Sequence, residues 1–371
     1  MKTEKWNLFK KNWFLNANPA LWFVVVYMAV MALIMLSFLD RFNLKGFNFF
    51  TFIWTYLTLL IVHSFLNRKR YLILWKYNRM EVFRSYVHAS YQYAPYLLIA
   101  VVYEHIFMYR DAFSHNFQLM DLTFMKWDAV LFGVQPTIWL QKYLYPLAVE
   151  YFMIAYVLFL VYPYFYLVYL YQKNQLPVFH KAMLAQVISL FVALTFFIIL
   201  PAKGPRATIP LSGQDSIENS DIPVYNKPLE GVHLNFLQEA TGKPSLFQLQ
   251  YDLWNRIERI KTDCMPSMHT CLCLIVLFYA VKYRHFFKYR KMAMWFWLVG
   301  NISLIFSTVY LRYHWAVDVI AGTILAVIAF YLTEAFYHFW LRKRTSFKMP
   351  GPQVDWIIKT DALMEAGENN S

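Results

Sequence analysis

The feature that most constrains this chain is a series of apolar blocks of about twenty residues, the length at which a helix crosses a bilayer. Eight such blocks lie at residues 20–38, 47–66, 89–107, 145–171, 182–201, 265–281, 293–311 and 314–337. Charged residues make up only 15% of the chain, whereas about 25% is usual in soluble domains. We therefore predict an all-α fold, a polytopic membrane helix bundle of about eight spans.

Basic residues indicate how the spans are oriented, because cytoplasmic loops carry an excess of lysine and arginine. With the N-terminus inside, 22 of the 35 basic residues fall on cytoplasmic segments. Both termini are then cytoplasmic, and the outer face is periplasmic or lumenal. The net charge of +13 is therefore explained by basic residues that set the membrane topology, and no nucleic-acid partner is expected.

Segment lengths and composition predict three parts. Residues 1–88 form an N-terminal two-span hairpin with a basic cytoplasmic loop, residues 89–340 form a six-span core, and residues 341–371 form a polar cytoplasmic tail that we expect to be mobile. Leucine and isoleucine recur at helical spacing between residues 245 and 260, which predicts an amphipathic helix that either lies on the membrane surface or caps the bundle. The cysteines at 264, 271 and 273 lack the spacing of a zinc site and are interpreted as small apolar filler.

Polar residues cluster at three span ends that the predicted topology places on the outer face: Pro201–Arg206, Cys264–His269 and Tyr310–Asp318. His314 and Asp318 are four residues apart at a helix start, so a hydrogen bond between carboxylate and imidazole is feasible. Such a bond leaves the other ring nitrogen as a nucleophile or base. The third cluster therefore predicts a reactive histidine.

The other two clusters add groups that suit a phosphate. Pro266 fits a first helical turn, whose free backbone donors together with Ser267 would form an anion site, and His269 projects from the same turn. Three cations can give charge-assisted hydrogen bonds to a tetrahedral dianion: Lys203, Arg206 and Arg312. Taken together, the three clusters favour phosphoryl transfer through a histidine.

Further ionisable residues lie within the apolar blocks. Because a charge inside a membrane is costly, such residues usually mark a functional site. Among them, Glu104 and His105 lie in the third block and Glu150 in the fourth. We predict that they shape a headgroup or acceptor pocket.

The clusters resemble the motifs of the type 2 phosphatidic acid phosphatase superfamily, and more closely its branch that includes inositol phosphorylceramide synthases. The superfamily pattern is KxxxxxxRP, then PSGH, then SRxxxxxHxxxD. The second element reads Pro266-Ser267-Met268-His269 here, with methionine in place of glycine. The third reads Ser307-Thr308 followed at intact spacing by His314 and Asp318, with threonine in place of arginine. The first departs most, because Lys203 and Arg206 are only three residues apart.

This resemblance implies a role for each matching residue. His314 would be the nucleophile that forms a phosphohistidine, Asp318 would orient it, and His269 would protonate the leaving group and later activate the acceptor. Phosphate binding would fall to Arg206, Lys203, Arg312, Ser267 and Met268. The resemblance implies no metal and no cofactor, a membrane lipid phosphate as substrate, and water or a lipid alcohol as acceptor.

Several interpretations stay open at this stage. A lipid phosphatase and a headgroup transferase like inositol phosphorylceramide synthase share the phosphoenzyme and differ only in what attacks it. A metal-dependent membrane hydrolase would use His269, His314 and Asp318 as ligands. A non-enzymatic lipid transporter would need polar residues near the bilayer midplane, whereas these clusters lie at span ends. The oligomeric state is not indicated.

Overall fold

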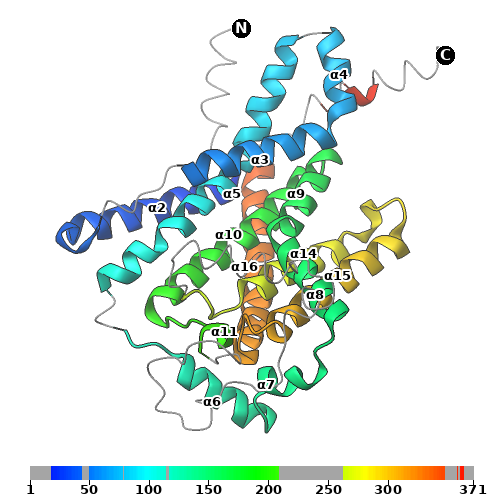
Figure 1. Ribbon diagram of the computed structural model, residues 1–371. Helices are drawn as coiled ribbons and strands as arrows, with labels where there is room; N and C mark the ends of the chain where they lie inside the picture. Colours follow the sequence, from blue (N-terminus) through cyan, green and yellow to red (C-terminus); the bar gives the residue numbers. More distant parts are fainter. Residues whose placement is uncertain are drawn as a thin grey trace. The chain divides into compact units, whose positions relative to one another are not determined.

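The computed structural model describes residues 18–43, 50–77, 79–113, 117–208, 262–346, 357 and 360–362 (Figure 1). Every regular element in these ranges is a helix. Their only β pairing is an isolated parallel bridge between Ala202 and Asp263. The prediction of an all-α fold is therefore confirmed for the described residues.

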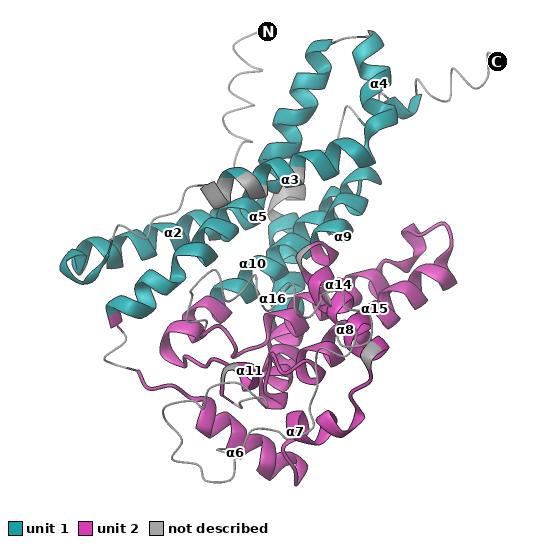
Figure 2. Cartoon of the chain, in the orientation of Figure 1, with its two compact units in different colours: residues 1–112, 164–191, 329–371 teal, residues 113–163, 192–328 magenta. Residues whose placement is uncertain are grey.

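The chain divides into two compact units, which Figure 2 shows in different colours. Unit 1 comprises residues 1–112, 164–191 and 329–371, and unit 2 comprises residues 113–163 and 192–328. These units follow from packing alone. They do not test the division predicted at residues 88 and 340, which stays a prediction.

Unit 1 is built from helices at both ends of the chain and in its middle. It holds α2 (Pro19–Ser37), the 3-10 turn η1 (Leu39–Arg41), α3 (Phe50–Leu66), α4 (Arg68–Tyr77), nearly all of α5 (Arg79–Phe113), most of α9 (Tyr162–Gln172), and parts of α10 (Leu176–Ile199) and α16 (Ala316–Ser346). Helix α2 begins where it does because the Asn18 side chain accepts a hydrogen bond from the backbone N–H of Ala20. Asn18 also donates to the backbone carbonyl of Gln92, which ties α2 to α5.

A few residues of the C-terminal tail are described, and they contact α4 of unit 1. Asp361 forms an ion pair of 2.8 Å with Arg70, and Ile357 is buried. Mobility of the rest of the tail stays a prediction. The amphipathic helix predicted at residues 245–260 lies outside the described residues.

Unit 2 carries all three polar clusters. Its helices are α6 (Asp121–Phe132), α7 (Pro136–Leu140), η4 (Gln141–Tyr143), α8 (Pro146–Val157), η5 (Leu158–Leu160), α11 (Pro205–Thr208), α14 (Met268–Lys282), η6 (Arg284–Phe286) and α15 (Arg290–Tyr310), with the end of α10 and the start of α16. Helix α15 packs against α14 and α8. A buried core cluster joins α6 to all three polar clusters: Phe124, Met125, Ala202, Cys264, Trp315 and Val317.

Four described helices are long and apolar enough to cross a membrane: α2, α10, α15 and the Ala316–Arg342 part of α16. Helices α8 and α9, bent by 50°, would make a fifth span if they act as one. Shorter apolar helices lie at Tyr56–Leu66 and Met268–Lys282, where the second and sixth spans are predicted. These helices agree with a membrane protein, but the count of eight spans is not confirmed. Helix α5, where the third span is predicted, also carries charged residues such as Arg79, Glu81 and Arg84.

An ion pair within unit 1 gives a first testable prediction. Lys181 on α10 and Glu334 on α16 are 2.8 Å apart, with side chains only 14% and 19% exposed. Since removing one partner leaves a charge poorly solvated, Lys181→Met should lower the free energy of unfolding by about 3 kcal/mol. The double variant Lys181→Met/Glu334→Leu should recover most of this loss. Thermal unfolding in detergent measures both, and equal losses in the two variants would show that the unpaired charge of Glu334 is not what destabilises Lys181→Met.

Candidate active site

The three polar clusters come together within unit 2 through backbone contacts. Ala202 and Asp263 form the isolated bridge, and the backbone N–H of Cys264 donates to the carbonyl of Ala202 at 3.3 Å. The backbone N–H of Ser267 donates to the carbonyl of Asp318 at 3.0 Å. The segments at 201–206, 263–269 and 310–318 therefore form a single site, although more than a hundred residues separate the first from the last.

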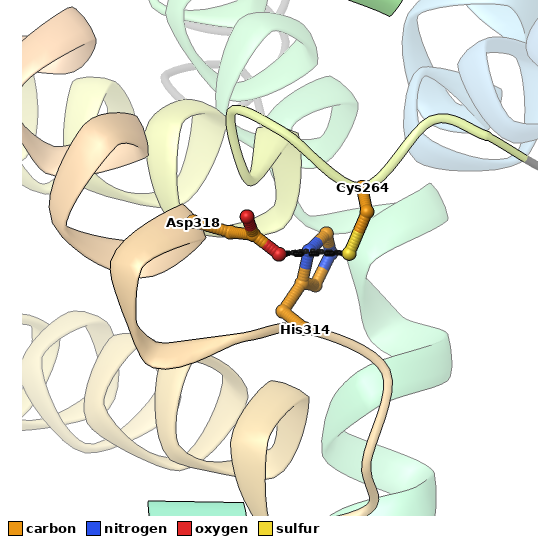
Figure 3. Close-up of side chains that lie close together, drawn as sticks. All are labelled: Cys264, His314 and Asp318. Carbon is orange, nitrogen blue, oxygen red and sulfur yellow. Dashed lines mark hydrogen bonds and ion pairs between the residues drawn. The ribbon is translucent and has the colours of Figure 1, made fainter. Parts of the chain in front are cut away.

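His314 and Asp318 occupy the centre of this site (Figure 3). His314 Nδ1 lies 3.5 Å from Asp318 Oδ2, an ion-pair distance longer than a usual hydrogen bond. The same Asp318 oxygen accepts hydrogen bonds from Cys264 Sγ at 2.7 Å and from the backbone N–H of Trp315 at 2.9 Å. The carboxylate is therefore held in place independently of the imidazole that it faces.

Cys264 has a larger role than the apolar filler expected from the sequence. Its sulfur lies 3.3 Å from His314 Nδ1 as well as 2.7 Å from Asp318 Oδ2, and the three side chains point toward one another (Figure 3). Burial and the neighbouring carboxylate of Asp318 hold the pKa of the Cys264 thiol well above its usual range. Cys264 thus stays protonated and donates to Asp318. Cys271 and Cys273 are buried in α14, as expected of filler.

The ligand atoms of Cys264, His314 and Asp318 all lie within 4.8 Å of one another, which is close enough to hold one ion. The metal-dependent alternative considered from the sequence uses a different set of ligands, with His269 in place of Cys264. His269 meets Nε2 of His314, whereas Asp318 faces Nδ1. A single ion bound to His314 could therefore not be shared by His269 and Asp318 in this arrangement.

His269 supplies the second histidine of the site. Its Nδ1 lies 3.1 Å from His314 Nε2, so the two rings are in direct hydrogen-bond contact. The ring of His269 stacks on Tyr156 of α8 with 4.5 Å between centroids and lies 4.1 Å from the ring of Phe159. Because aromatic rings hold the imidazole on this side, its position against His314 is fixed by packing.

The start of α14 differs slightly from the expectation for the second cluster. The helix begins at Met268, and Ser267 is its N-cap, with its hydroxyl accepting from the backbone N–H of Thr270 at 3.4 Å. Pro266 therefore precedes the helix instead of occupying its first turn, because Ser267 caps the helix by accepting from one of its free backbone donors. Phosphate binding by Ser267 and Met268, which are both buried, stays a prediction.

The cations of the first cluster behave differently from one another. Arg206 donates a hydrogen bond from Nη1 to the hydroxyl of Tyr313, and its guanidinium lies 4.9 Å from the centre of that ring. Tyr313 in turn stacks on Tyr156 at 4.0 Å, so Arg206 is linked through two rings to His269. Lys203 is anchored by its backbone N–H, which donates to Asp121. Contact of the Lys203 side chain with phosphate stays a prediction.

Arg312 sits in the tight turn before His314. It is only 1% exposed and has φ of +66°, a left-handed conformation that is uncommon for residues other than glycine. The carbonyl of Thr308 fixes this turn by accepting from the backbone N–H groups of Tyr313 at 2.8 Å and His314 at 3.0 Å. The Thr308 hydroxyl donates to its own helix, at the carbonyl of Ile305. Contact of the Arg312 side chain with phosphate stays a prediction.

Two aspartates of α6 hold the site together, and the sequence did not single them out. Asp128 accepts from the backbone N–H groups of Ala316 at 2.9 Å and Val317 at 2.8 Å, which are first-turn donors of α16. Asp121 accepts from the backbone N–H groups of Lys203 and Gly204 and from the indole of Trp315. One carboxylate therefore fixes the helix that carries Asp318, and the other clamps the first cluster to the third.

The titration of Asp128 gives a second prediction. Burial raises its pKa from 3.8 to about 6, although the two backbone donors favour the charged form. Because the folded protein holds this proton more tightly than the unfolded chain, stability present below about pH 4 is lost as the pH rises through about 6. The thermal midpoint of the wild type minus that of Asp128→Asn should therefore fall between about pH 4.5 and about pH 7.5. A constant difference would contradict this assignment.

Gly204 gives a third prediction, because its φ is +83° and an alanine Cβ there would collide with the backbone oxygen of Tyr313 and lie 3.0 Å from Cys264 Sγ. Gly204→Ala should lower activity at least about tenfold, since the first and third clusters must separate. The matched control is Gly133→Ala, where φ is +69° but nothing lies within 4 Å of the added carbon. The control should keep its activity and lose only about 1 kcal/mol of stability. Equal activity losses in the two variants would contradict the clamp.

The residues predicted to form a headgroup or acceptor pocket belong to different units. Glu104 and His105 lie on α5 in unit 1, where His105 is buried and its Nδ1 contacts the carbonyl of Val101 at 2.7 Å. Glu150 lies on α8 in unit 2. Their role in a headgroup or acceptor pocket stays a prediction.

A family model matches the part of the chain that carries this site. The model of the PAP2 superfamily matches residues 122–332, which include all three polar clusters and most of α6. The chain belongs to the PAP2 superfamily. Comparisons with curated proteins and with solved structures find no match.

Membership of the PAP2 superfamily supports a phosphatase or phosphotransferase activity, in line with the prediction from the motifs. The matched residues begin after the first three predicted spans and end within α16. His269, His314 and Asp318 all fall inside the match. The finer assignment to a branch like the inositol phosphorylceramide synthases is not decided by this match.

Proposed function

We propose that this PAP2-superfamily protein cleaves a lipid phosphate ester through a phosphohistidine formed on Nε2 of His314. The observation that carries the proposal is the pair of contacts made by the two ring nitrogens. Nδ1 faces Asp318 at 3.5 Å, and Nε2 faces His269 at 3.1 Å. One nitrogen can therefore be charge-stabilised while the other attacks, with an acid or base beside it.

In the first step, Nε2 of His314 attacks phosphorus and the bond from phosphorus to the ester oxygen breaks. Protonated His269 gives its proton to the departing alkoxide, so that a neutral alcohol leaves. The positive charge that develops on the His314 ring is stabilised by Asp318, which Cys264 and the Trp315 N–H hold in position. In the second step, His269 takes a proton from the acceptor hydroxyl, whose oxygen attacks phosphorus and frees His314.

Charge on the phosphate would be met by Arg206 and Arg312, with Lys203 nearby in sequence. Arg206 is the stronger candidate, because Tyr313 and Tyr156 link it to His269 on the side from which phosphate must reach Nε2. A guanidinium binds two phosphate oxygens at once, which suits a dianion whose charge grows in the transition state. Arg312 is buried and lies two residues before His314. It would contact the phosphate from the turn that carries His314.

A lipid substrate is proposed because the helices that carry the site are apolar enough to cross a membrane. Helix α15 ends at Tyr310 and α16 begins at Ala316, so the reactive turn lies between two candidate spans. A phosphate at a bilayer surface would meet the turn there, with its acyl chains among the spans. The predicted topology places this end on the periplasmic or lumenal face.

A second candidate is a headgroup transferase of the inositol phosphorylceramide synthase type. It is favoured by the burial of the residues around His314. His314 is 4% exposed, Cys264 3% and Asp318 0%. Tyr156 and Phe159 lie against the ring of His269, which would activate the acceptor. Exclusion of water from the phosphohistidine would give a lipid alcohol time to attack.

Mass spectrometry of lipid products separates the two candidates. Purified enzyme and its His314→Ala variant are incubated with phosphatidic acid, phosphatidylinositol and ceramide in one micelle, with and without a chelator. Free phosphate with diacylglycerol would support the phosphatase, and a new headgroup-bearing ceramide would support the transferase. Unchanged products in His314→Ala would overturn the proposal, and loss of activity in chelator would favour a metal-dependent hydrolase.

A further inference from the structure

A second charged site of unit 2 lies at the other end of α15 from the reactive turn. A shallow open pocket of about 340 Å³ is lined by Arg284, Arg290, Lys291, Met294, Trp295 and Leu298. Helix α15 runs from Arg290 to Tyr310, and at about 1.5 Å per residue it is roughly 30 Å long. The pocket therefore lies well apart from His314 and plays no part in the reaction proposed above.

The cations of the pocket are not neutralised by the hairpin that carries them. No aspartate or glutamate occurs between Asp263 and Asp318, whereas five lysines and arginines fall between residues 282 and 291. Among the described residues, no ion pair is formed by Arg284, Arg290 or Lys291, and all three are exposed. Three positive charges gathered around one hollow attract an anionic group such as a phosphate, whose oxygens accept charge-assisted hydrogen bonds.

The remaining lining is apolar and continues along α15. Trp295 is 66% exposed and Leu298 is 39% exposed, and Ile302 follows one turn later at 60%. These side chains share a helix face because they are three, four and seven residues apart. A tryptophan beside basic residues at the end of a candidate span is typical of the bilayer interface.

We propose that this pocket binds an anionic phospholipid of the surrounding bilayer. The phosphate headgroup would contact Arg284, Arg290 and Lys291, and an acyl chain would lie along Trp295, Leu298 and Ile302. The charged end and the apolar stripe together match an amphiphile better than a free phosphate. Basic pockets beside membrane helices on the cytoplasmic side recognise anionic headgroups in this way, and the predicted topology places residues 282–291 on that side.

The test measures how many phospholipid molecules the purified full-length protein retains in detergent, by native mass spectrometry with phosphatidylglycerol or phosphatidylcholine added. The wild type should retain phosphatidylglycerol about tenfold better or more, because each cation near an anionic headgroup contributes several-fold. The variant Arg284→Gln/Arg290→Gln/Lys291→Gln should retain the two lipids equally. The matched control, Arg68→Gln/Lys69→Gln/Lys76→Gln on α4, removes the same charge from exposed positions elsewhere and should keep the preference.

Three results would overturn the proposal: no lipid preference in the wild type, an unchanged preference in the pocket variant, or a preference lost equally in the control. Competition by soluble glycerol phosphate at the same concentration as the lipid would also overturn it, because it would show a free-anion site. An unchanged thermal midpoint verifies that the pocket variant folds. If it does not fold, Lys291→Gln alone should weaken retention of phosphatidylglycerol about fivefold.

Discussion

Replacement of His314 by alanine should abolish turnover, with a fall in kcat of at least about 10³-fold, while the protein keeps its fold. The large effect is expected because the variant removes the atom that accepts the phosphoryl group, and no other described nitrogen has its setting between Asp318 and His269. The fold should survive because the turn is fixed by backbone hydrogen bonds to Thr308, which alanine preserves. Steady-state kinetics and thermal unfolding measure the two parts.

The matched control for this variant is His285→Ala. His285 is an exposed histidine of η6 in the same unit and lies in the hairpin before α15. It should keep wild-type kinetics. If His314→Ala keeps more than about one tenth of the wild-type activity, His314 is not the nucleophile.

Replacement of His269 by alanine should lower kcat by about 10² to 10⁴ for a lipid phosphate, because the alkoxide must then leave without a proton. The loss should be much smaller in the first step when the leaving group is an aryl oxide, which needs no protonation. In that case the phosphoenzyme should accumulate, since the second step still lacks its base. Rapid-quench kinetics with an alkyl and an aryl phosphate would detect the difference.

Tyr156→Phe is the control for His269, because it keeps the ring that stacks on the imidazole and removes only the hydroxyl. Its kcat should stay within about threefold of the wild type. Equal losses of His269→Ala for the two leaving groups would show that this histidine positions other groups and does not transfer the proton.

Much of the fold and site could be predicted because the informative patterns are local. The spacing of His314 and Asp318 predicts that the two side chains meet, and they do so although His314 lies in the turn before α16 and only Asp318 lies on the helix. The apolar runs predict an all-helical bundle. The count of spans was harder, because helices such as α5 and α8 carry polar residues or bends within the runs. Length and hydropathy alone do not separate such helices from spans.

The contacts that hold the site depend on tertiary structure and carry no local signal. Cys264 reaches Asp318 from 54 positions earlier, and its hydrogen bond replaces the shorter imidazole contact that the sequence suggested. Asp128 caps the start of α16 from a helix nearly two hundred residues away in sequence. Two aspartates seven residues apart in the short helix α6 were the available clue, and they indicated a solvent-facing helix as readily as a clamp.

The most direct test of the phosphohistidine is to trap it. His269→Ala enzyme is mixed with an aryl phosphate, quenched within a turnover at alkaline pH to preserve the phosphorus–nitrogen bond, digested, and analysed by mass spectrometry for a phosphorylated peptide. Phosphate is expected on His314, and none is expected in the His269→Ala/His314→Ala double variant. Turnover without any phosphopeptide, or phosphate on Asp318 or Cys264, would contradict the proposed phosphohistidine.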